Sequence, residues 1–420
     1  MRTSLYTILF VMALLGWQSS AGTAITETPF HPRIQPAPPE PDMPDISHAL
    51  LAEHAAQSHD LPADQVAWLS QGAWDEDHCS TTLYPPGGPL CVPGIPNGHH
   101  SWDPDNNLFW NEPAWWGDFG PGLSHAVYMF GNAVNAYQAG NDQAAYLWLG
   151  RALHLVGDVA TPAHVHLDSH LPFDPDSYEN WLAEADYSNT QAWIELNPAG
   201  PGWDYDFHDL PGWDELDPEL QASLDAASQL YGGRASGQAL WEQGPQGEDR
   251  IIFQVMYLVA EEADNFDSDD VPGERYPGDL SDPLYLAQIR ERMFPLLVRH
   301  SAALIAYFEA LILPPPPPGL ISPDDGAWVE TARPVFTWQP VGVDPSYSLE
   351  ITVEPGSTNP LIRAQTNQPT YTPSSTLAPG SYYWRVQAET QAGSGSWSET
   401  WQFITPWKAH LPFVVSSGNN

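Results

Sequence analysis

Basic residues are scarce in this chain of 420 residues. It carries 13 Lys and Arg against 53 Asp and Glu, so its formal net charge is −40. A surface of this charge repels phosphate backbones and anionic lipid headgroups, so bulk electrostatics attracts neither nucleic acid nor an anionic membrane. We therefore expect no stable nucleic-acid complex. Acidity of this kind also keeps a protein soluble, and bound metal ions would reverse its sign locally.

Cysteine is nearly absent as well, since the chain contains only Cys79 and Cys91. In an oxidising compartment two cysteines this close together pair, closing a short loop and stabilising the fold by roughly 2–3 kcal/mol in the chain-entropy description. We expect this disulfide in preference to metal ligation by the two thiols.

Long apolar runs are also few. Met1 and Arg2 precede the apolar run Leu5–Trp17 and the small residues Ser19–Ala24, which together are typical of a signal peptide over residues 1–24. The run is shorter than the ~20 residues that a membrane span needs, and we expect no other segment to be long and apolar enough to cross a bilayer. The sequence thus predicts an exported, soluble protein, unless an uncleaved leader anchors it. We also expect a monomer.

The remaining chain divides into a mainly α part and a smaller all-β part. A proline-rich arm covers residues 25–45, and a helical domain is predicted over 46–313, with helical patterns at 46–71, 121–139, 141–160, 177–187, 216–231, 247–265 and 282–312. Five prolines at 314–318 predict a polyproline II spacer of about 15 Å. Alternating patterns at 334–338, 347–353, 382–388 and 400–404 then predict a small β-sandwich over 319–407, followed by a tail to residue 420.

The most informative segment is HLVGDVATPAH at 154–164. His154 and Asp158 are four residues apart, so on a helix they share a face. Pro162 should end or kink this helix and let His164 reach the same side. Imidazole and carboxylate together suit Zn²⁺ better than Ca²⁺ or Mg²⁺. A hydrogen-bonded surface pair is the alternative, but the strongly apolar surroundings make unsatisfied polar groups costly and favour a metal.

Four other segments carry histidines or acids in order along the helical part. They are ISHALLAEHA with His48, QGAWDED with Asp75 directly after the first predicted helix, HSWDPD with His100, and DPDSYENW with Glu179. Each residue alone is an ordinary loop or capping residue. Together they form an ordered set that solubility does not explain.

These segments resemble those of the zinc-dependent phospholipase C and S1/P1 nuclease superfamily. The resemblance implies a multi-helix domain that binds zinc through seven residues, namely His48, Asp75, His100, His154, Asp158, His164 and Glu179. Asp75, His100, His154 and Asp158 would hold one ion, and Asp158 would bridge to a second ion held by His48. A further ion would bind His164 and Glu179.

Two departures from this family affect the third ion. The family's histidine four residues before the glutamate is Pro175 here, so His170 is our first candidate for the ligand and Asp174 our second. The family also uses the amino group of an N-terminal Trp, and none lies between Trp17 and His48. The sequence therefore leaves two alternatives for the number of bound zinc ions, two or three.

The implied activity is zinc-dependent hydrolysis of a phosphodiester, as in phospholipase C, with Asp75 holding or deprotonating the attacking water. The partner would be a phospholipid, with peripheral contact to a membrane or surface. Glu76 and Asn97 replace the aromatic residues that contact choline in bacterial members, which weakens a choline preference. Five loop aromatics could instead form a substrate-contacting rim or pack locally, namely Trp102, Phe109, Trp110, Trp115 and Trp116. A P1-type single-strand nuclease and a non-catalytic zinc- or surface-binding homologue remain alternatives.

The β part resembles a fibronectin type III domain. The phrase ISPDDG at 321–326, Phe336-Thr-Trp338 and the strand beginning at Gly380 carry this resemblance. It contains no catalytic constellation and lacks the calcium-ligand clusters of a lipid-docking C2-type domain. We therefore expect a spacer or surface-binding module, without support for membrane tethering.

Overall fold

A computed structural model of the chain describes residues 46–57, 59, 61–78, 101–104, 122–168, 176–183, 206–230, 236–245 and 250–406. The predicted leader, proline-rich arm and tail lie outside the described residues. So do Cys79, Cys91, His100, His170 and Asp174, together with Asn97 and four of the five loop aromatics.

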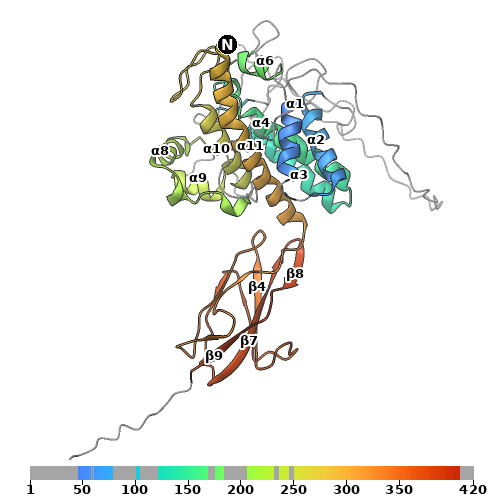
Figure 1. Cartoon of the computed structure of the whole chain (residues 1–420), viewed down its shortest axis with the longest axis vertical. Helices are drawn as coiled ribbons and strands as arrows, with labels where there is room; N and C mark the ends of the chain where they lie inside the picture. The colour runs from blue at the N-terminus through green and yellow to red at the C-terminus, as the bar shows by residue number, and fades with distance from the viewer. Residues whose placement is uncertain are drawn as a thin grey trace, which may run out of the picture. The chain divides into compact units, whose positions relative to one another are not determined.

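Helices form the first part of the described chain (Figure 1). They are α1 (Ile46–Gln57), α2 (Ala63–His78), α3 (Gly122–Gln138), α4 (Asp142–Asp158), α5 (Pro162–Val165), α6 (Ser177–Ala183), α8 (Pro218–Ala227), α9 (Gly237–Gln243), α10 (Arg250–Ala263) and α11 (Pro283–Ile312). Two 3₁₀ turns, η3 (Phe207–Asp209) and η4 (Trp213–Glu215), lie between α6 and α8.

The site of interest is built on α4, which is buried along most of its length. Asn141 caps this helix, because its side-chain oxygen accepts a hydrogen bond from the Ala144 amide at 3.2 Å. Glycines let α2 approach α4 closely. A Cβ atom on Gly72 would lie 2.1 Å from the Leu147 carbonyl oxygen, and one on Gly150 would lie 2.0 Å from that of Leu69.

The first predicted helix, 46–71, is two helices in the structure. α1 ends at Gln57 and α2 begins at Ala63, directly after Pro62, whose ring cannot continue a helix from the preceding turn. The Pro62 carbonyl instead accepts a hydrogen bond from the Val66 amide at 3.0 Å, in the first turn of α2. The sequence analysis placed Asp75 directly after a helix. In the structure Asp75 lies inside α2.

One expectation about apolar segments was wrong. The 30-residue helix α11 is long and apolar enough to cross a membrane by length and composition, although we expected no such segment after the leader. In the structure, 61% of its apolar window is buried inside the molecule. Ile289, Leu304 and Phe308 are fully buried in the helical core, which is the behaviour of a central core helix.

Strands form the last part of the described chain. They are β1 (Leu320–Ser322), β2 (Ala327–Trp328), β3 (Phe336–Trp338), β4 (Ser346–Thr352), β5 (Ile362–Thr366), β6 (Thr370–Tyr371), β7 (Gly380–Thr390), β8 (Gly393–Trp397) and β9 (Trp401–Thr405). One sheet has the order β1-β3-β6, and the other has the order β2-β9-β7-β4-β5, with β8 paired to β7. The predicted fold class, a mainly α part followed by an all-β part, is confirmed.

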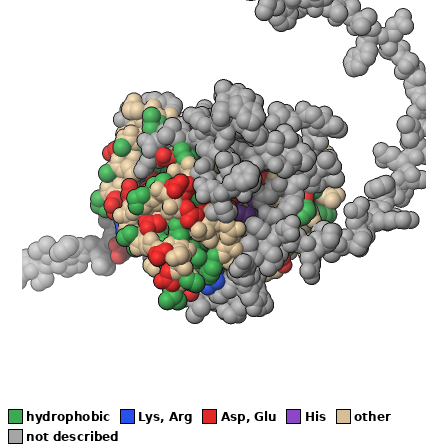
Figure 2. All heavy atoms as spheres, turned by 90° about the horizontal axis from the view of Figure 1, so that it is seen from above, with side chains coloured by type: hydrophobic (Ala, Val, Ile, Leu, Met, Phe, Trp, Pro, Cys, Tyr) green, Lys and Arg blue, Asp and Glu red, His purple; other side chains and the backbone are tan. Residues whose placement is uncertain are grey.

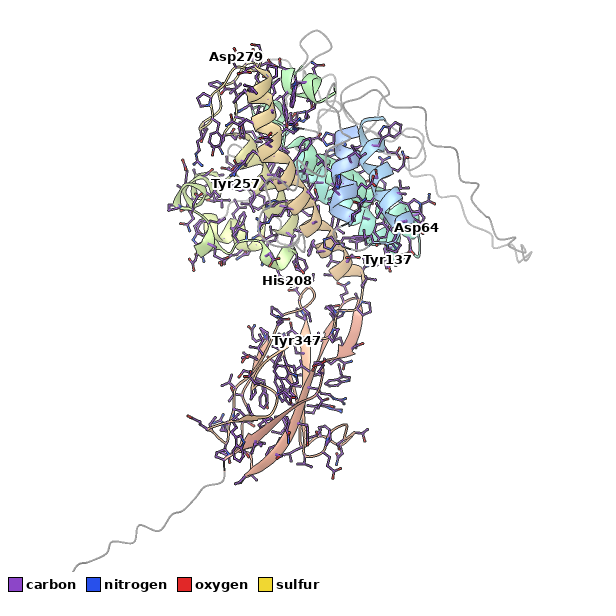
Figure 3. All side chains as sticks on the ribbon, viewed as in Figure 1. Asp64, Tyr137, His208, Tyr257, Asp279 and Tyr347 are labelled. Carbon is purple, nitrogen blue, oxygen red and sulfur yellow. The ribbon has the colours of Figure 1, made fainter. Side chains whose placement is uncertain are left out.

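The strand part has its own hydrophobic core, separate from that of the helices. Residues of β7 alternate between this core and half-buried positions, as the pattern predicted, whereas β4 alternates only in its first half and is buried from Leu349 to Thr352. Tyr347, labelled in Figure 3, is buried there beside Trp338, with ring centroids 5.3 Å apart. The excess of acids over bases is visible on the described part of the surface in Figure 2.

Candidate metal centre

His154 and Asp158 lie on the last turns of α4, where both side chains are buried. Their four-residue spacing puts one above the other, and His154 Nε2 lies 3.3 Å from Asp158 Oδ1. This is the pairing that the sequence predicted for a shared ligand face.

His48 joins this pair from the first turn of α1. Its Nε2 lies 3.6 Å from Asp158 Oδ1, and its ring centroid lies 4.3 Å from that of His154. One ligand atom from each of the three residues falls within 4.8 Å of the others, the arrangement that a single metal ion requires. Segments far apart in the sequence thus supply two imidazoles and one carboxylate.

Gly157 makes room for His48. A Cβ atom at this position would lie 2.2 Å from His48 Nδ1. Any side chain on residue 157 would therefore displace the imidazole from Asp158. The glycine lies next to a predicted ligand in the sequence, but its role depends on a contact with α1 that the spacing along α4 does not reveal.

The tautomer of His154 shows how the site fits a cation. His154 Nδ1 lies 2.8 Å from the Ala73 carbonyl oxygen. A carbonyl only accepts, so Nδ1 carries the proton, and in the neutral ring Nε2 is then an acceptor. It faces Asp158 Oδ1, which is an acceptor too. Two buried acceptors at this distance need a cation or a proton between them, and a carbonyl that fixes a histidine ring is typical of zinc sites.

Asp75 is buried on α2, two residues after Ala73. Its Oδ1 accepts a hydrogen bond from Gln71 Nε2 at 2.8 Å, and its Oδ2 lies 3.9 Å from Arg151 Nη2. Among the described residues, it is not part of the group of three whose ligand atoms lie within 4.8 Å. Its predicted role as ligand and catalytic group stays a prediction.

His164 and Glu179 form a second pair. α4 ends at Asp158 and Pro162 opens the short helix α5, so the predicted break at this proline is present and brings His164 into a new helix. His164 Nε2 lies 3.1 Å from Glu179 Oε1 on α6. The two residues that the resemblance assigned to one ion are therefore in contact.

Asp176 is a buried acid beside this pair that sequence reasoning did not single out. Its Oδ1 accepts a hydrogen bond from the Glu179 amide at 2.6 Å, which caps α6. Burial and the neighbouring Glu179 carboxylate raise the pKa of Asp176 to about 7. The spacing of a capping Asp and a Glu three residues later is a helix-start signal that could have indicated it.

Trp102 does not belong to the proposed aromatic rim, because it is buried. Trp102 is fully buried and packs edge-on against Phe253 of α10, with ring centroids 6.3 Å apart. Its amide donates to the His164 carbonyl at 3.2 Å, which ties the HSWDPD segment to α5. Trp102 is thus a core residue, because it fills the space between these elements.

Comparisons with known proteins gave structural likeness only. No protein-family profile and no curated protein matches the sequence. The alpha toxin of Clostridium absonum aligns over 86% of this chain and 99% of its own, with a TM-score of 0.39 and 11% identity. The alpha-toxin of a Clostridium perfringens avian strain gives the same coverage and identity with a TM-score of 0.38. A human fibronectin type III domain aligns over 27% of this chain and 91% of its own, with a TM-score of 0.19 and 19% identity.

Proposed function

We propose that this chain is a zinc-dependent hydrolase of phosphodiesters that acts on phospholipids in the manner of phospholipase C. The observation that carries the proposal is the group formed by His48, His154 and Asp158, in which buried acceptor atoms face one another. Two imidazoles and a carboxylate are a common zinc ligand set.

The balance of buried charge supports a bound cation. Asp75, Glu76 and Asp158 are buried acids on α2 and α4, and Arg151 is the buried base beside them. A divalent cation would bring positive charge to the place where these buried acids gather. Zinc, when bound, lowers the pKa of a water ligand and neutralises charge on phosphoryl oxygens.

The chain's own residues would divide the work. The resemblance assigned His154 and Asp158 to one ion and His48 to a second ion bridged by Asp158, whereas the proximity of the three ligand atoms also suits a single shared ion. His164 and Glu179 would bind a further ion, with His100 and His170 completing the ligand sets. Asp75 would bind zinc as a further ligand and would also orient or deprotonate the attacking water. The count of two or three ions is part of the proposal.

Phospholipid is favoured over nucleic acid because of the overall charge. A net charge of −40 repels a polyanionic backbone through bulk electrostatics. A single phosphodiester headgroup meets only the local field of the site. The leader-like run Leu5–Trp17 further suggests that the enzyme acts outside the cell.

Zinc content tests the site. Elemental analysis of the purified wild type should give two or three zinc ions per chain, and His154→Ala should lose at least one. His208→Ala is the matched control, because His208, labelled in Figure 3, pairs with Asp206 at 2.7 Å and is not among the three grouped ligands. Unchanged zinc in His154→Ala would refute the site.

Hydrolysis then separates the candidate activities. We expect cleavage of a phospholipid and a phosphocholine ester, abolished by chelation. Cleavage of single-stranded nucleic acid in preference to both would identify a nuclease. Bound zinc without hydrolysis of any of these substrates would identify a non-catalytic zinc-binding protein.

A further inference from the structure

An ion pair lies buried between α2 and α4 beside the candidate metal centre. Arg151 Nη1 on α4 lies 3.4 Å from Glu76 Oε2 on α2, and the two residues are 0% and 1% exposed. Arg151 precedes His154 by one helical turn, so it shares the buried face that carries the two α4 ligands.

Stability alone does not explain why such a pair would be retained. Desolvating two charges costs about as much as their attraction returns, and apolar residues of similar volume often do as well or better. A fully buried pair is therefore a reason to look for what else its members contact. Arg151 also faces Asp75, with Nη2 at 3.9 Å from Oδ2.

Glu76 and Asp75 lie at different distances from the Arg151 guanidinium. Glu76 is within hydrogen-bond distance and matches the charge of Arg151, whereas Asp75 is too far for a hydrogen bond. Asp75 is held on its other oxygen by Gln71 at 2.8 Å. Asp75 thus lies between Gln71, which donates a hydrogen bond to Oδ1, and Arg151, whose guanidinium faces Oδ2 at ion-pair distance.

We infer that Arg151, with its charge balanced by Glu76, is a positioning residue that orients the Asp75 carboxylate toward bound zinc. The inference rests on the proposed function, because it takes Asp75 as a zinc ligand. It also gives Glu76 a role in the interior, since a carboxylate buried against Arg151 does not face a substrate.

The test is the double variant Arg151→Met/Glu76→Gln, which removes both charges and keeps similar volumes. In chelator it should unfold at about the wild-type denaturant concentration, whereas Arg151→Met alone should be destabilised because the buried Glu76 charge loses the guanidinium. Zinc affinity, measured by competition with a chromophoric chelator, should fall about 10- to 100-fold in the double variant.

A second background shows whether the effect passes through Asp75. In Asp75→Asn, the same double substitution should change zinc affinity less than about 3-fold, because the carboxylate through which Arg151 acts is already absent. The control is Arg292→Met/Glu262→Gln, which removes an Arg–Glu pair between α10 and α11 that is 2.5 Å apart. It should leave zinc affinity unchanged.

Three outcomes overturn the inference. They are wild-type zinc affinity in the Arg151→Met/Glu76→Gln variant, an equal fall with and without Asp75, and a fall of the same size in the α10–α11 control. A wild-type protein that binds no zinc would instead refute the proposed function, so the two failures are distinguishable.

Discussion

At the scale of single residues, Gly157 has the clearest consequence. Gly157→Ala would place a Cβ atom 2.2 Å from His48 Nδ1, so the imidazole must move away from Asp158. We expect zinc content to fall by at least one ion, as judged by elemental analysis. Gly131→Ala on α3 is the matched control, since a Cβ atom there meets nothing within 4 Å. It should keep full zinc and gain up to about 1 kcal/mol in helix stability.

Glu309 on α11 should make stability depend on pH. Burial raises its pKa to about 7 in the folded protein from an ordinary value of 4.5. The folded state thus favours the protonated form, so stability falls as pH rises from about 4.5 to 7 and stays lower above that. Glu309→Gln removes this loss.

In chelator, we expect Glu309→Gln to gain about 2 kcal/mol over wild type between pH 5 and pH 8, less than the full shift implies because the side chain is partly exposed. Denaturant unfolding at the two pH values measures this gain. The exposed Glu399→Gln should show no such change. An equal difference between Glu309→Gln and wild type at both pH values would contradict the prediction.

At the scale of elements, the contact of α2 with α4 depends on small residues. Gly150→Ala would put a Cβ atom 2.0 Å from the Leu69 carbonyl oxygen, and backbone cannot move aside as a side chain can. The helices must separate, at a cost of about 2 kcal/mol in the free energy of unfolding. Denaturant unfolding against Gly131→Ala as reference measures this cost. Equal stability of the two variants would mean that the helices adjust freely.

Some features of the helices could be predicted from the sequence and others could not. The ligand spacing on α4 and the break at Pro162 were predictable, because helical periodicity and proline geometry are local properties. The separation of α1 from α2 was missed, although Pro62 marks it. Arg151, Gly157 and the Ala73 carbonyl could not be predicted, because their roles depend on contacts between helices that no spacing along one helix specifies.

At the scale of the whole molecule, the two hydrophobic cores should respond differently to metal. The described candidate ligands belong to the helical part, and the strands have a core of their own. In calorimetry, a chelator should lower the transition of the helical part by several degrees and leave that of the strands unchanged. His154→Ala should show the lowered helical transition without chelator. A shift of both transitions together would show that the two parts unfold as one unit.

The position of His48 gives the metal centre one more consequence. His48 and His154 are separated by a stretch of ~100 residues, and closing a loop of that length costs an unfolded chain about 4 to 5 kcal/mol of entropy. An ion held at both ends would close this loop as a covalent cross-link does. Cys79 and Cys91 lie within the same stretch of sequence. The chain would then have a metal cross-link that reducing agents leave intact and that is lost only when the metal is removed.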